Sequence, residues 1–187
     1  YQEENMIKYR EIFESQFLEK FEDHCRDEIA ELELNDDEYS INVDRIIELL
    51  DLQVKGLIID IHSGKLEDGI IYVNVTESEN RQRFTKAHEI GHHLLGHEGI
   101  NGVNYRSDLI GGIEEQQAND FAANLLMPKK LILKTLKKIV DDYGIDLDEI
   151  NKIPVNTVIS LLSKYMNVSN SAIRFRLSNL NMLSERV

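Results

Sequence analysis

The sequence predicts an α+β fold in which several helices accompany a small antiparallel sheet. Apolar residues recur at helical spacing over most of the chain. Two short runs rich in isoleucine and valine, over 56–61 and 70–75, interrupt this pattern and are typical of strands. With 187 residues, of which 42% are hydrophobic, the chain can build one sizeable core. We expect a main domain over residues 1–141, which includes an N-terminal helix. A helical C-terminal segment is expected over residues 142–187.

Helices are predicted wherever apolar residues return every three to four positions. The expected helices cover residues 6–34, 42–52, 80–95, 113–126, 128–141, 155–166 and 169–181. The first is acidic and amphipathic, as is usual for a helix that packs against a core. Gly96 is a natural end for the third helix, and the glycine-rich stretch 97–112 is expected to be a loop.

The two expected strands precede the helix over 80–95. Residues 63–69 between them look like turns, so we expect the strands to pair antiparallel. The second strand, which ends near Val73, is a candidate for pairing with an extended peptide.

Charge and composition limit the classes of partner. The net charge of −13 argues against nucleic-acid binding by the chain as a whole. Residues 152–187 differ, because five basic residues and one acidic residue give this stretch +4. No apolar run approaches the length of a transmembrane helix. The single cysteine, Cys25, and an N-terminus without the apolar core of a signal peptide favour a cytoplasmic protein.

One motif predicts a metal site. His88, Glu89 and His92 form His-Glu-x-x-His, in which the two histidines stand one above the other on a helix. Two neutral imidazoles in this arrangement can occupy two corners of a zinc tetrahedron. Glu89 then points to one side of His92, where a general base for a zinc-activated water belongs.

A catalytic zinc needs a third protein ligand, and the segment from 114 to 126 offers three acids, of which Asp120 points away from the apolar stripe. Glu114 and Glu115 flank the apolar stripe of this expected helix, each near its buried face. A metal is one partner that offsets the cost of burying such a carboxylate. Alternatively, either acid is favoured simply by the positive end of the helix dipole. Periodicity does not distinguish Glu114 from Glu115.

Two blocks together resemble the ImmA/IrrE family of zinc metallo-endopeptidases. They are Arg83-Phe84-Thr85-x-Ala87-His88-Glu89-Ile90-Gly91-His92, and Glu115-x-x-Ala118-Asn119-x-Phe121-Ala122-x-x-Leu125-Leu126-Met127-Pro128, within roughly residues 40–130. The resemblance implies a minimal zincin-like domain with one Zn²⁺ per chain. It implies His88, His92 and Glu115 as ligands and Glu89 as the catalytic base. It also implies that Asn119 orients a ligand histidine, although Asn119 can also be an ordinary polar residue of the helix.

Two further residues are candidates for contacts with the site. His97 lies just past the metal helix. It either supports a metal ligand or contacts the transition state or the substrate, or it is a surface or capping histidine. Tyr105 lies in the glycine-rich loop between the two blocks, where it either donates to an oxyanion or packs within the loop.

The resemblance implies an endopeptidase that cleaves a cytoplasmic transcriptional repressor, a helix-turn-helix protein of the phage or mobile-element type, and so relieves repression. The alternative is a regulatory or toxin–antitoxin protein that keeps the zinc fold but acts by association. A third possibility is DNA binding by the C-terminal helices, in which Arg174 and Arg176 would contact phosphates. The acidic body of the chain disfavours this last reading.

Overall fold

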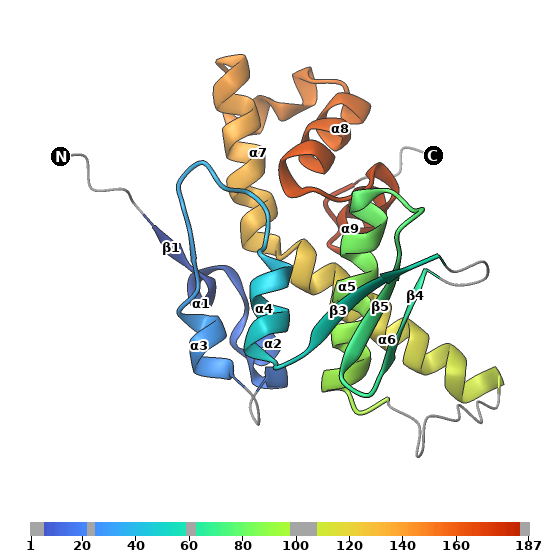
Figure 1. The fold of residues 1–187 in the computed structure, drawn as a ribbon. Coiled ribbons are helices and arrows are strands. Elements are labelled where there is room, and N and C mark those ends of the chain that lie inside the picture. Colours follow the sequence, from blue (N-terminus) through green and yellow to red (C-terminus); the bar gives the residue numbers. More distant parts are fainter. Residues whose placement is uncertain (1–5, 22–24, 59–62, 98–107, 184–187) are drawn as a thin grey trace.

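The computed structural model describes residues 6–21, 25–58, 63–97 and 108–183, and they form an α+β fold (Figure 1). Helices predominate, and two small sheets accompany them. The predicted fold class is therefore confirmed. A hydrophobic core runs from Tyr9 near the N-terminus to Leu177 near the C-terminus, so both expected segments of the chain contribute to it.

The N-terminal part consists of short pieces, and the prediction of one helix over 6–34 was wrong. Its elements are β1 (Ile7–Lys8), α1 (Tyr9–Ile12), α2 (Ser15–Leu18), η1 (Glu19–Phe21), α3 (Arg26–Ala30) and β2 (Glu33–Leu34), with β1 antiparallel to β2. The backbone is extended at Phe13 and Glu14, which ends α1. This break allows Phe13 to stack on Phe17 at 5.1 Å between ring centroids, and Phe17 to reach Phe121 at 5.1 Å. Buried aromatic residues therefore produced the apolar repeat without a continuous helix.

The sheet beside the predicted metal helix has three strands in the order β3-β5-β4. The chain forms α4 (Val43–Leu49), β3 (Gln53–Leu57), β4 (Gly64–Glu67) and β5 (Ile70–Asn74) in succession. The expected strand over 70–75 corresponds to β5, whereas β3 begins at Gln53 and overlaps the strand expected over 56–61 only at Gly56 and Leu57. Residues 59–61 lie outside the described residues. The strands β3 and β5 run parallel, with Val54 opposite Ile71. The antiparallel partner of β5 is β4, which forms in the stretch predicted as turns. The extra strand reverses the chain once more, and this makes β3 and β5 parallel.

Because β5 lies between β3 and β4, its two edges are already paired. The expectation that the strand ending near Val73 pairs with a peptide was therefore wrong. Within the part of the chain that the structure describes, the outer edges of this sheet belong to β3 and β4.

Two long helices, α5 (Glu79–Leu94) and α6 (Asp108–Leu126), pack against each other behind this sheet (Figure 1). Ser78 caps α5 by accepting a hydrogen bond from the Arg81 amide at 3.3 Å. The helices approach closely at Gly91, where an added Cβ would lie 3.1 Å from Phe121 Cβ and 3.2 Å from Ala118 Cα. Glycine at this position therefore sets the spacing between the two helices.

The C-terminal part is helical, as predicted. It comprises α7 (Lys129–Tyr143), the 3₁₀ helix η3 (Leu147–Lys152), α8 (Val155–Met166) and α9 (Asn170–Asn179). Arg176 of α9 is buried, and its guanidinium donates to the Met127 carbonyl and to Asn124 Oδ1, each at 2.9 Å. This arginine therefore holds α9 against the end of α6 and does not face solvent as a phosphate contact would. Among the described residues, no helix has the length and apolar character needed to cross a membrane.

Candidate metal centre

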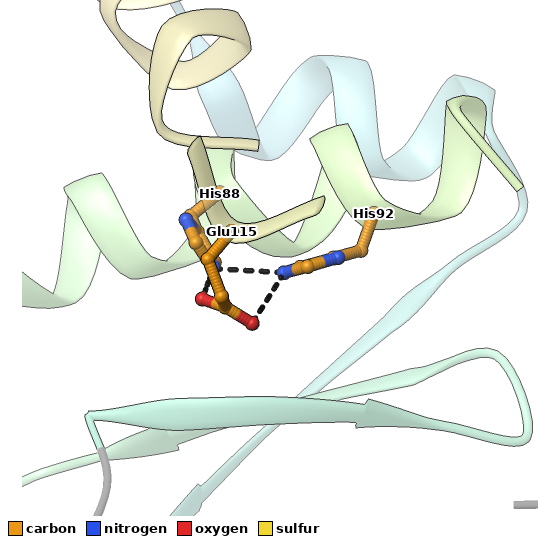
Figure 2. A group of neighbouring side chains, drawn as sticks. All are labelled: His88, His92 and Glu115. Carbon is orange, nitrogen blue, oxygen red and sulfur yellow. Dashed lines mark hydrogen bonds and ion pairs between the residues drawn. The ribbon is translucent and has the colours of Figure 1, made fainter. Parts of the chain in front are cut away.

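Three side chains from α5 and α6 converge on one point (Figure 2). His88 and His92 project from successive turns of α5, and Glu115 projects from α6. The two Nε2 atoms are 3.0 Å apart. The Glu115 carboxylate lies 3.3 Å from His88 Nε2 and 3.4 Å from His92 Nε2. All three predicted ligands are therefore brought together, and Glu115 rather than Glu114 is the acid that joins the histidines.

Asn119 contacts the outer ring nitrogen of His88. It lies one helical turn after Glu115, and its Oδ1 is 3.0 Å from His88 Nδ1. An amide oxygen only accepts, so Nδ1 of His88 carries the hydrogen. The lone pair of this neutral imidazole then resides on Nε2 and faces His92 and Glu115. Such a partner on the outer ring nitrogen is typical of metal-binding histidines.

His97 plays the corresponding part for His92. Nδ1 of His92 lies 3.1 Å from His97 Nδ1, and His97 Nε2 lies 3.0 Å from Gln117 Oε1. When the Gln117 oxygen accepts from Nε2 of a neutral His97, the lone pair of that ring is on Nδ1, which then accepts from His92 Nδ1. The Nε2 atom of His92 is thus left with its lone pair, as in His88.

The end of α5 puts His97 in this place. Gly96 adopts φ +68°, and the His97 amide donates back to the His92 carbonyl at 3.0 Å. The Gly96 amide donates to the His93 carbonyl at 3.3 Å, which completes a Schellman motif. The predicted helix stop therefore also brings His97 to Nδ1 of His92, the ring nitrogen that does not face Glu115.

The donor set fits a tetrahedral cation. Two Nε2 lone pairs and a carboxylate are all acceptors, and without a positive charge between them they repel one another. Nitrogen ligands at about 2.0–2.1 Å from zinc are separated by about 3.3–3.4 Å in a tetrahedron, close to the spacings seen here. Burial lowers the pKa of His88, and the charge of Glu115 opposes this shift. The imidazole is therefore favoured in the neutral, metal-binding form. Nitrogen and oxygen donors of this kind suit zinc.

The remaining predicted residues are distributed as follows. Glu89 lies between the two histidines on α5, and its side chain is buried at 7% exposure. It is not one of the three converging donors, which agrees with a base rather than a ligand. Glu114 is half-buried on α6 and lies outside the cluster. Tyr105 lies outside the described residues.

Sequence reasoning missed Gln117. Its contribution depends on the position of His97, which in turn depends on the turn at Gly96. The available signal was the Leu-Gly-His sequence at the end of the helix, which is compatible with a Schellman motif and so with a His97 that folds back. No sequence pattern indicated that Gln117 of α6 would contact His97.

Comparison with known proteins identifies the family of the chain. A family model described as the IrrE N-terminal-like domain matches residues 45–178. The chain is 30% identical over 116 residues to the radiation response metalloprotease IrrE of Deinococcus radiodurans. That match covers 60% of the present chain and 31% of the relative, so the chain spans less than half of the relative's length.

Proposed function

Since the chain belongs to the family of IrrE N-terminal-like domains, we propose that it is a zinc-dependent endopeptidase. The observation that supports this most is the convergence of His88, His92 and Glu115, with both imidazoles oriented through their outer nitrogens. Three protein ligands leave a fourth position for water or substrate, which distinguishes a catalytic zinc site from a structural one.

In this proposal His88, His92 and Glu115 hold the ion, while Asn119 and His97 keep the two imidazoles in the ligand tautomer. Zinc bound there would supply a Lewis acid that acidifies a water molecule and polarises the peptide carbonyl. Glu89 takes the proton from the attacking water as the new C–O bond forms, and then delivers it to the nitrogen of the leaving amine as the C–N bond breaks. The burial of Glu89 shields this proton transfer from bulk solvent.

The proposed substrate is a cytoplasmic transcriptional repressor of the helix-turn-helix type, whose cleavage relieves repression. The resemblance to ImmA/IrrE peptidases suggests this class. A net charge of −13 is compatible with docking a basic DNA-binding protein through complementary fields. The outer edges of β3 and β4 provide hydrogen-bonding groups for an extended segment of such a substrate.

The test compares the wild-type chain with Glu89→Gln and with Glu79→Gln, a matched change at an exposed position on the same helix. The zinc-loaded proteins are incubated with the repressor encoded beside the gene, and fragments are identified by mass spectrometry. We expect Glu89→Gln to retain one zinc per chain and to lose cleavage by at least about a hundredfold. Glu79→Gln should cleave normally.

Undiminished cleavage by Glu89→Gln would contradict the role of Glu89. A stable complex without fragments from any variant would instead support a regulator that acts by association. A chelator arm completes the design, because cleavage that persists after zinc removal is inconsistent with a metal-dependent peptidase.

A further inference from the structure

A cavity of about 350 Å³ lies between α5, α6 and α9. The larger part of its wall is apolar and comes from Phe84, Ala123, Met127, Ala172 and Phe175. Polar side chains, among them Asn80, Arg81 and Asn119, line the rest. Phe175 is 55% exposed, and its ring forms part of the cavity wall that solvent can reach. The cavity is large enough for a bulky side chain.

This cavity adjoins the candidate metal centre, with Asn119 between them. On α5, Phe84 precedes His88 by one helical turn, and their ring centroids are 6.5 Å apart. On α6, Ala123 follows Asn119 by one turn, and Asn119 both lines the cavity and contacts His88. The two helices therefore present the metal donors on one pair of turns and the apolar wall on the next.

The third wall, α9, is fixed to the other two. Asn80 Nδ2 donates to the Val168 carbonyl at 3.2 Å, which ties the start of α5 to the turn before α9. At the other side, the buried guanidinium of Arg176 donates to the Met127 carbonyl at 2.9 Å. The cavity is therefore formed before a ligand arrives, so a ligand would not have to order its walls.

Arg81, the only cation among the described residues that line the cavity, is already engaged. Arg81 Nε and one terminal nitrogen lie 3.1 and 3.0 Å from Ser63 Oγ, and Nε lies 3.8 Å from the Glu77 carboxylate. Its guanidinium lies 5.9 Å from the centroid of the Phe84 ring. An acidic ligand would compete with Glu77 for this charge. An apolar ligand can contact the apolar side chains of the wall without breaking this ion pair.

On the basis of the peptidase function above, we propose that this cavity is a specificity pocket that receives a large apolar side chain of the peptide substrate. The pocket begins about one helical turn from the metal donors, which an extended peptide spans in about two residues. The side chain that it selects therefore lies within about two residues of the cleaved bond. The C-terminal helix α9 thereby becomes part of the substrate site.

The test measures binding rather than turnover. The probes are two series of peptide hydroxamates. One series varies the residue before the zinc-binding group, and the other varies the residue after it. The varied residue is glycine, leucine, phenylalanine or glutamate. Dissociation constants are measured by calorimetry on the zinc-loaded full chain. In one series we expect leucine or phenylalanine to bind about tenfold tighter than glycine, because the apolar side chain leaves water.

Two variants change opposite properties of the pocket. Phe175→Ala removes a wall, and Ala172→Phe fills the space; each should reduce the preference over glycine to about twofold or less while glycine binding is kept. Tyr143→Ala, a matched loss of an aromatic side chain that is 52% exposed and does not line the cavity, should keep the preference. Zinc content of one per chain verifies that each variant is folded.

A preference that survives both variants, or tightest binding of the glutamate compound, would overturn this assignment. The outcome is separable from that for the peptidase. If the compounds show side-chain selection but no peptide is cleaved, the pocket assignment is supported and the peptidase function is contradicted. If a peptide mixture is cleaved with no apolar preference near the cleaved bond, the peptidase function is supported and the pocket assignment is contradicted.

Discussion

Replacement of Asn119 by alanine is expected to weaken zinc binding without removing any ligand. Asn119 Oδ1 accepts from His88 Nδ1 at 3.0 Å, and the His88 side chain is 14% exposed. Without this acceptor, the imidazole can rotate or shift its proton to Nε2, and then it no longer offers a lone pair to the metal.

The expected loss follows from the position of the bond. Deleting one partner of a buried hydrogen bond costs about 1–3 kcal/mol. Asn119 is itself exposed, so water can replace part of the interaction, and we expect the lower half of this range. A loss of about 1.4 kcal/mol corresponds to a tenfold higher dissociation constant, at the low end of the 10–100-fold typical of such partners.

The assay is competition for zinc against a fluorescent chelator. Gln116→Ala, an exposed polar residue on the same helix, is the control for changes in α6 itself. Asn119→Asp should bind zinc at least as tightly as the wild type, because a carboxylate is the stronger acceptor. Equal affinities for Asn119→Ala and Gln116→Ala would refute the assignment of Asn119 as the residue that orients His88.

Three other outcomes are expected. Zinc at a concentration one hundred times its dissociation constant should stabilise the fold by about 2.7 kcal/mol. Calorimetry should therefore show that chelation lowers the Tm by about 5–11 °C. An unchanged Tm would mean that the native state holds no ion. Gly91→Val should lower the free energy of unfolding in urea by about 1–3 kcal/mol, because the new side chain meets Phe121 and the α6 backbone; unaltered stability would show that the helices can separate without cost. Arg176→Met should destabilise by about 1–3 kcal/mol through the loss of its bonds to Met127 and Asn124, whereas the exposed Arg174→Met should have little effect; equal effects would rule out this role for Arg176.

Sequence patterns located the metal helix well because several signals coincide there. The spacing of His88 and His92, the apolar stripe and the glycine stop all describe one helix, and α5 spans Glu79–Leu94 against an expected 80–95. Glu115 illustrates the limit of this reasoning. Periodicity left Glu114 and Glu115 equivalent, since it describes one helix and not the rotation of one helix against another. Resemblance favoured Glu115, and the packing of α6 on α5 places that residue at the histidines.

Strand direction and helix continuity were harder to predict for physical reasons. The residues of β3 and β5 are suited to extended backbone, but their direction relative to each other depends on whether 63–69 is a turn or a further strand. In the N-terminal part, Phe13, Phe17 and Phe21 recur at helical spacing. The rings of Phe17 and Phe21 pack against Phe121, and Phe13 stacks on Phe17. Tertiary packing overrode local preference in both cases.

The attachment of α9 separates the residues that hold the metal from the residues that line the neighbouring cavity. Among the described residues, the three converging donors come from α5 and α6, while α9 contributes side chains to the neighbouring cavity and none to the donors. Substitutions at exposed positions of α9, such as Ser171 and Phe175, can therefore accumulate during divergence without disturbing zinc affinity. Relatives that share the same chemistry are free to differ in the peptides that they accept, provided that Arg176 and its acceptors keep the helix in register.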